Sequence, residues 1–188
     1  MRRELSDEAI CVRKFRFSES SWIVWWLTRN HGIVHTLAGG RRKNPTPSTQ
    51  PDLFYEAEIT WVHGRGDGLA QLREVQVRFV FPGLRGGFAR LAAASYFAEA
   101  IARSVEHQSS VPDLFALLEK ALVYLDQHEP TLHLVERFER RLFGSLGIDD
   151  GTQPLNQVRS MVFHPLPPSY GVLRQALAIE PFGDGSNG

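Results

Sequence analysis

The hydrophobic residues of this 188-residue chain change their spacing near Pro82, and this change limits the folds that the chain can adopt. Before Pro82, short runs rich in aromatic and β-branched residues alternate apolar with polar side chains, which is the period of a β-strand. From Phe88 onward, apolar residues recur every three or four positions, which is the period of an α-helix. We therefore predict an α+β protein with one domain over residues 1–81 and an all-helical domain, ending in a flexible tail, over residues 82–188.

Turn residues divide the first part into five expected strands, at residues 9–17, 22–28, 33–38, 52–63 and 69–81. In the first strand, regular alternation places Arg13 on the face of Cys11, and Lys14 on the face of Ile10 and Val12. The imperfect alternation of the fifth strand suggests a bulge. Five short strands are typical of a small β-barrel and match the OB-fold, which often holds single-stranded nucleic acid or oligosaccharide on one face.

The second part contains five expected helices. At the second of them, Pro112 suits the first helical position and Asp113 suits the positive N-terminal end of the helix. The expected helices cover residues 88–106, a segment that begins at Pro112, and residues 131–146, 155–163 and 169–179.

The formal net charge is zero, but the charges are unevenly distributed along the chain. Residues 1–43 hold nine cations and four acids, and the rest of the chain is acidic by the same margin. No apolar run approaches the roughly 20 residues of a membrane-spanning helix, and the N-terminus does not resemble a signal peptide. We expect a cytoplasmic protein with no membrane partner.

No arrangement of residues points to catalysis or to a metal site. Cys11 is the only cysteine, so neither an internal disulfide nor a multi-cysteine zinc site can form. His31 lies in an expected turn, none of His31, His35 and His63 begins a His-x-Glu pair, and no Gly-x-Ser-x-Gly string is present. The glycine-rich residues 64–68 lack the Lys-Ser/Thr pair of a phosphate loop and are expected to form a hairpin. We predict no enzymatic activity and no cofactor.

The most concentrated positive charge follows the third expected strand, where Gly39 and Gly40 precede Arg41, Arg42 and Lys43. Cations beside glycines allow close approach to phosphates, and the alternative is a loop that is basic for solubility. Three further cations on the first strand extend this site or, alternatively, protect an exposed strand edge. They are Arg13, Lys14 and Arg16.

Three tryptophans lie close together in the second expected strand. Period two places Trp22 and Trp26 on one face and Trp25 on the other, so at most one face is free to stack on bases. The alternative is that all three belong to the core. Arg65, in the expected hairpin, is a further candidate for a phosphate contact.

Eight short strings, in order between residues 18 and 147, resemble those of RecO, a family of bacterial recombination mediators. One of them, Thr28-Arg29-Asn30-His31-Gly32, is similar to the family's Thr-Arg-x-His-Gly turn. The strings lie at residues 18–21, 27–32, 38–42, 50–58, 72–74, 94–99, 113–118 and 138–147.

The resemblance implies a non-enzymatic protein with an OB-fold that binds single- and double-stranded DNA, anneals strands and helps to load recombinase. It also implies two protein partners, RecR and the acidic C-terminal tail of the single-stranded-DNA-binding protein. It adds Arg29 to the DNA-binding candidates, and it favours Trp25 as the exposed tryptophan because the family tends to have a small polar residue there.

For the acidic tail, the resemblance suggests a groove in the helical part, and the alternative is that its apolar residues are core. The candidates are Leu114, Phe115 and Leu118, with Arg137, Arg140 or Arg141 meeting the tail's carboxylate.

The chain departs from the family pattern after Gly147. Many members carry a four-cysteine zinc site there, whereas this chain has no cysteine in that segment. Part of the partner-binding surface is therefore in question. An alternative function is a protein–protein adaptor in DNA repair that has lost DNA binding.

Overall fold

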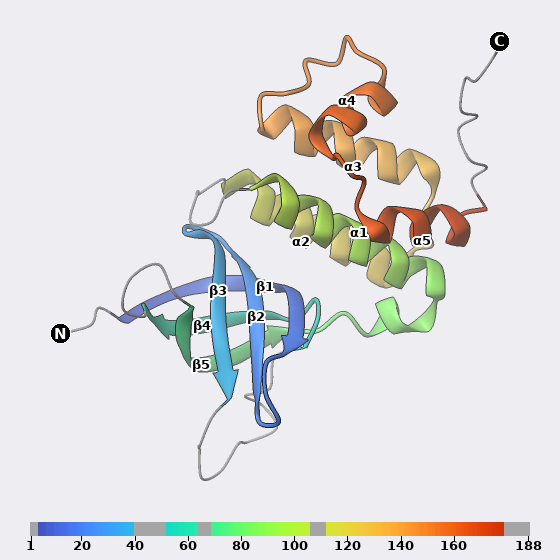
Figure 1. Ribbon diagram of the computed structural model, residues 1–188. Helices are drawn as coiled ribbons and strands as arrows, with labels where there is room; N and C mark the ends of the chain where they lie inside the picture. The colour runs from blue at the N-terminus through green and yellow to red at the C-terminus, as the bar shows by residue number, and fades with distance from the viewer. Residues whose placement is uncertain (1–3, 40–51, 64–68, 106–111, 179–188) are drawn as a thin grey trace.

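The computed structural model describes residues 4–39, 52–63, 69–105 and 112–178. Five strands close into a barrel in the order β1-β2-β3-β5-β4, and the helices lie beyond one side of it (Figure 1). The pairs are antiparallel except for β3 with β5, which is parallel. The strands are β1 (Glu4–Arg16), β2 (Ser21–Thr28), β3 (Gly32–Gly39), β4 (Glu56–Val62) and β5 (Ala70–Phe79). This arrangement is an OB-fold, so the predicted α+β fold with a five-stranded barrel followed by helices is confirmed.

The first strand is longer than expected, because β1 pairs along both of its edges. Its first half, from Glu4 to Ile10, pairs with β4, while residues from Ala9 onward pair with β2. The sequence pattern did not indicate a strand before Ala9, because Asp7 and Glu8 are charged. Such pairing with neighbouring strands overrides weak local β-propensity.

A bulge between Cys11 and Arg13 corrects the expected faces of β1. Cys11 pairs with Trp26 in the barrel interior, whereas Arg13 pairs with Trp25, which packs on the outside. Lys14 pairs with the buried Val24 and so follows the interior face. The prediction that Arg13 shares the face of Cys11 is therefore wrong, since the extra residue at the bulge reverses the alternation.

The fourth strand starts later than expected. Residues 52–55 form a turn in which the Tyr55 amide donates to the Asp52 carbonyl at 3.2 Å, and Phe54 has a φ of 66°. The Phe54 amide also donates to the Cys11 carbonyl at 2.8 Å, which ties this turn to β1. The bulge expected in β5 appears as two register shifts between β4 and β5.

Two hydrophobic clusters form the core. One fills the barrel and contains Trp26 and Trp61. The other combines the helices with residues on the outside of the barrel, among them Ile10, Leu27 and Ile33. The barrel and the helices therefore share a continuous apolar interface.

The helical part begins with a short 3-10 segment, η2 (Pro82–Gly86), and continues with five α-helices. Their bounds agree with the expected ones to within a few residues. Thr131 caps the N-terminus of α3, where its side chain accepts a hydrogen bond from the Leu134 amide. The helices are α1 (Phe88–Ser104), α2 (Pro112–Gln127), α3 (Leu132–Ser145), α4 (Leu155–Val162) and α5 (Pro168–Ala176). Within the described residues, no helix is long and apolar enough to cross a membrane.

A buried ion pair attaches α4 to the rest of the helices. The Arg159 guanidinium donates to both Glu139 carboxylate oxygens, at 2.6 and 2.5 Å, and the Tyr96 hydroxyl donates to the same carboxylate. Arg159 also lies over the Tyr170 ring, with its Cζ 4.8 Å from the centroid. Burial, and then the neighbouring Glu139 carboxylate, raise the pKa of Tyr96, so its hydroxyl keeps the proton that it donates. Four helices therefore meet at one polar cluster.

Candidate nucleic-acid interface

Exposed aromatic side chains gather at the end of the β1–β2 hairpin. Phe15, Phe17 and Trp22 are 39%, 59% and 40% exposed, although most aromatic residues of the chain are buried. Cations lie between them in the sequence. We call this set the hairpin surface, and it consists of Arg13, Lys14, Phe15, Arg16, Phe17, Trp22 and Trp25.

The hairpin surface is exposed because residues 13–16 of β1 pair with β2 and not with β4. A tight turn closes the hairpin, where the Phe17 amide donates to the Ser21 carbonyl at 3.0 Å. Arg16 donates to the carbonyls of Ser18 and Glu19 at 3.1 and 3.3 Å, which holds its side chain beside the turn. Among the described residues, no strand pairs with the other edge of this part of β1.

Cations and rings are in contact on both faces of the hairpin. On the outer face, the Arg13 Cζ lies 4.9 Å from the Trp25 ring centroid, and Trp25 stacks on His35 with 4.1 Å between centroids. On the other face, the Lys14 ammonium lies 4.6 Å from the Trp22 ring. Such contacts are favourable at exposed sites and hold each cation beside an aromatic face. Both faces thus combine positive charge with a stacking surface.

The three tryptophans occupy three different environments. Trp26 is fully buried in the barrel, where its Nε1 donates to the Thr36 hydroxyl at 3.0 Å. Trp25 is half-buried between Arg13 and His35. Trp22 is the most exposed, so the expectation that singled out Trp25 pointed to the less accessible ring.

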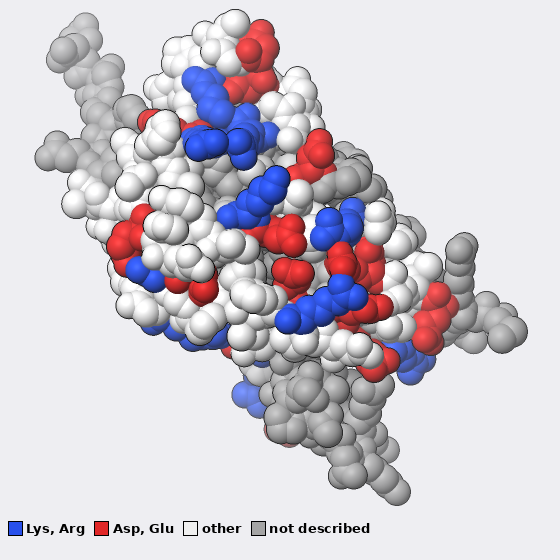
Figure 2. All heavy atoms as spheres, turned by 180° about the vertical axis from the view of Figure 1, so that it is seen from behind, with Lys and Arg blue, Asp and Glu red and all other residues white. Residues whose placement is uncertain are grey.

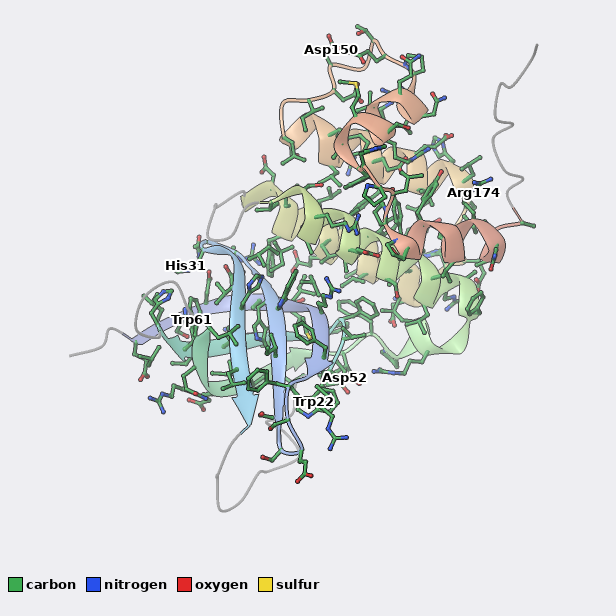
Figure 3. All side chains as sticks on the ribbon, viewed as in Figure 1. Trp22, His31, Asp52, Trp61, Asp150 and Arg174 are labelled. Carbon is green, nitrogen blue, oxygen red and sulfur yellow. The ribbon has the colours of Figure 1, made fainter. Side chains whose placement is uncertain are left out.

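Arg29 lies apart from the hairpin surface. Figure 3 places Trp22 and His31 at opposite ends of the barrel, and Arg29 is two residues from His31. Its Nε is 2.6 Å from the Glu8 carboxylate, and its Cζ lies 4.3 Å from the ring of Phe115 in α2. Arg29 therefore joins the barrel to the helices, and it lies apart from the described DNA-binding candidates of the hairpin surface.

The predicted groove for an acidic tail is not formed by the expected apolar residues. Leu114, Phe115 and Leu118 are fully buried in the core that α2 shares with its neighbours. They face inward because they occupy one side of α2 at helical spacing. The alternative that they are core is correct, and they do not line a surface groove.

The three arginines proposed beside that groove have different surroundings. Arg137 and Arg141 are exposed on α3. Arg140 is engaged instead, with its Nη1 2.7 Å from the Asp149 carboxylate and its Nη2 2.9 Å from the Gln153 carbonyl. The Arg140 hydrogen bond is the largest cause of the lowered pKa of Asp149.

The positive excess of the N-terminal segment lies outside the described residues. Residues 4–39 hold four cations and four acids, so the excess comes from residues 2, 3 and 41–43. Arg41, Arg42, Lys43 and Arg65 all lie outside the described ranges. The described part of β3 ends at Gly39, which pairs with Ser21 beside Trp22. On the face shown in Figure 2, acidic and basic side chains are intermingled.

Phe15 and Phe17 were not among the predicted site residues, and Trp22 was considered for base stacking but Trp25 was favoured. The signal that could have identified Phe15 and Phe17 is the run Arg13-Lys14-Phe15-Arg16-Phe17, which interleaves cations with aromatics. Among the described residues, no cluster of three His, Cys, Asp or Glu side chains could hold a metal ion.

Comparison with known sequences agrees with the order of barrel and helices. The family model described as "Recombination protein O N terminal" matches residues 1–81, and "Recombination protein O C terminal" matches residues 85–149. The "DNA repair protein RecO" of Xanthomonas euvesicatoria pv. vesicatoria is 30% identical over 177 residues, which cover 89% of this chain and 70% of that protein.

Two further relatives with the same printed name are similar over a shorter region. The protein of Rhodopirellula baltica is 31% identical over 146 residues, and that of Geobacter sulfurreducens is 32% identical over 143 residues. These regions cover 77% and 74% of this chain but 54% and 57% of the relatives. The chain thus spans little more than half the length of these two relatives.

Proposed function

Because this chain belongs to the RecO family of DNA repair proteins, we propose that it binds DNA through the hairpin surface. The observation that carries this proposal is the group of exposed aromatic rings interleaved with cations at one end of the barrel. Neighbouring exposed apolar side chains, unlike apolar residues scattered singly over a surface, are typical of a binding site. Many proteins that bind single-stranded nucleic acid combine aromatic rings with cations in this way.

Each component of the hairpin surface would have a separate role. Trp22 would stack on an unpaired base, an interaction worth about 1–3 kcal/mol per base and tolerant of sequence. Arg13, Lys14 and Arg16 would neutralise phosphates, and each neutralised phosphate releases counterions. Arg41, Arg42 and Lys43, which follow Gly39 closely in the sequence, would add to this charge. The proposal therefore favours single-stranded DNA, in which bases are free to stack, with weaker binding to duplex DNA.

Family membership supports a broader role in recombinational repair. We extend the proposal to strand annealing and to recombinase loading in the cytoplasm, without catalysis by this chain. The extension includes RecR and the tail of the single-stranded-DNA-binding protein as partners. Leu114, Phe115 and Leu118 are excluded from that tail site because they are buried, whereas the exposed Arg137 and Arg141 remain candidates to meet its carboxylate.

Salt-dependent binding tests DNA binding by the whole chain. A fluorescein-labelled oligothymidylate would be titrated with the protein at increasing NaCl concentrations, and its anisotropy would be followed. Each phosphate contact is expected to contribute about −0.7 to the slope of log affinity against log salt. A steep negative slope supports the proposal. Absence of binding at low salt would overturn it and favour the adaptor that acts through proteins alone.

A further inference from the structure

A groove runs between the barrel and α2. In Figure 1, β2 and β3 lie in front of β4 and β5. The groove has a volume of about 670 Å³ and lies between the start of β4, the end of β5 and the outer side of α2. It is lined by Glu56, Arg78, Phe79, Glu119, Lys120, Val123, Tyr124, Gln127 and His128.

The walls of the groove are apolar and accessible. Phe79, Val123 and Tyr124 are 50%, 50% and 41% exposed, and they come from both sides of the groove. Phe79 is supported from behind by Phe81, with 4.9 Å between ring centroids, and Tyr124 stacks on His128 at 4.4 Å. Neighbouring apolar side chains rimmed by charges are typical of an interaction site. An open groove of this kind fits a protein segment better than a small molecule, which needs a more enclosing pocket.

Most charges at the groove are already paired. Arg78 contacts the carboxylates of both Glu8 and Glu58, and Glu119 lies 3.9 Å from the Arg29 guanidinium. Lys120 is exposed at the rim, where a single ion pair is weak because solvent screens it. The cations of the groove therefore offer little to an acidic ligand.

Apart from Lys120 at the exposed rim, Glu56 is the exception among these charges. Its half-buried carboxylate has no ion pair or hydrogen bond within the described residues. Burial is the first cause of its raised pKa, the nearby carboxylates of Glu119 and Glu8 raise it further, and the cations Arg29 and Arg78 offset this rise only in part. A half-buried carboxylate beside other acids is stabilised when a cation comes close, and more strongly than a fully exposed one. Inside the groove, as distinct from its exposed rim, the charge that has no ion pair among the described residues is therefore negative.

We propose that this groove binds a segment of a partner protein in which an aromatic or aliphatic side chain adjoins a lysine or arginine. The apolar side chain enters between Phe79, Val123 and Tyr124, and the cation pairs with Glu56. This chemistry is opposite to that of an acidic tail. The groove and the hairpin surface have no residue in common, so the inference does not depend on DNA binding.

Two capped dipeptides provide matched probes for this chemistry. Acetyl-Phe-Lys-amide and acetyl-Phe-Glu-amide differ in the sign of one charge and have no terminal charges. Each would be titrated into the full-length ¹⁵N-labelled protein, with amide shifts of Val123 and Tyr124 followed by NMR. The lysine peptide is expected to bind with a dissociation constant on the order of 1–10 mM. We expect it to bind about two- to fivefold more tightly than the glutamate peptide, as one partly exposed ion pair allows.

Two variants and one control locate the binding. Glu56→Gln is expected to abolish the preference for the lysine peptide, and Val123→Ser to weaken both peptides. Glu136→Gln, which removes an exposed charge on α3, should change neither result. Equal binding of the two peptides, a preference that survives Glu56→Gln, or no shift at the groove would each overturn the proposal.

Discussion

Replacing Arg159 with alanine tests the buried ion pair that attaches α4 to α3. The guanidinium makes two short hydrogen bonds to Glu139, and both side chains are almost completely buried. Without it, the Glu139 carboxylate keeps one strong donor, the Tyr96 hydroxyl, in a place that water does not reach. Removing one member of such a pair costs about 3–5 kcal/mol. In a chain of this length, that corresponds to a fall in Tm of about 6–20 °C.

Thermal and guanidinium unfolding, followed by circular dichroism, would measure this loss. Arg141→Ala is the matched control, because it removes an exposed arginine from α3 and should change stability by less than about 0.5 kcal/mol. Replacing both Glu139 and Arg159 with methionine should recover most of the loss, since an apolar pair needs no ionic partner. A loss below about 1 kcal/mol for Arg159→Ala would refute the reasoning, because a buried carboxylate without its partner must cost more.

Three further predictions concern the barrel and the groove. Glu56→Gln should stabilise the protein at neutral pH, because the raised pKa means that ionised Glu56 disfavours the folded state. This gain should vanish below about pH 4, where glutamate is protonated in both states, and pH-dependent unfolding would show it; a gain that persists in acid would contradict this cause. Burial raises the pKa of Cys11 to about 12, so a disulfide reagent should modify the thiol only after unfolding, and rapid reaction of the native protein would contradict its burial. Trp22→Ala should weaken oligothymidylate binding about 5- to 150-fold, whereas Phe88→Ala, which removes an exposed ring from α1, should leave it unchanged in the same anisotropy assay.

The sequence was sufficient to predict the order of strands and helices, because hydrophobic periodicity depends on neighbouring residues alone. It could not predict the bulge at Val12, which one extra residue in β1 creates only when β2 pairs beside it. That single residue decides that Arg13 faces Trp25 and not the barrel interior. The face on which a cation lies therefore followed from strand pairing and not from alternation.

The sequence also could not predict which individual side chains are exposed. Phe115 and Arg29 were candidates for two different binding sites, yet they contact each other where α2 meets the barrel. Only the packing of helices on the barrel brings these residues together. The groove could not be predicted from the sequence for the same reason, because Glu56 and Val123 are far apart in the chain and line one groove only in the folded protein.

The salt dependence of DNA affinity in a variant of the hairpin surface tests the central claim most directly. The measurement compares wild-type protein with Arg13→Ala/Arg16→Ala, using the same oligothymidylate, and Arg137→Ala/Arg141→Ala serves as a control of equal charge change. Loss of two phosphate contacts should reduce the slope of log affinity against log salt by about 1.4 for the hairpin variant, with no change for the control. Equal slopes for wild type and hairpin variant would contradict the assignment of DNA binding to this surface.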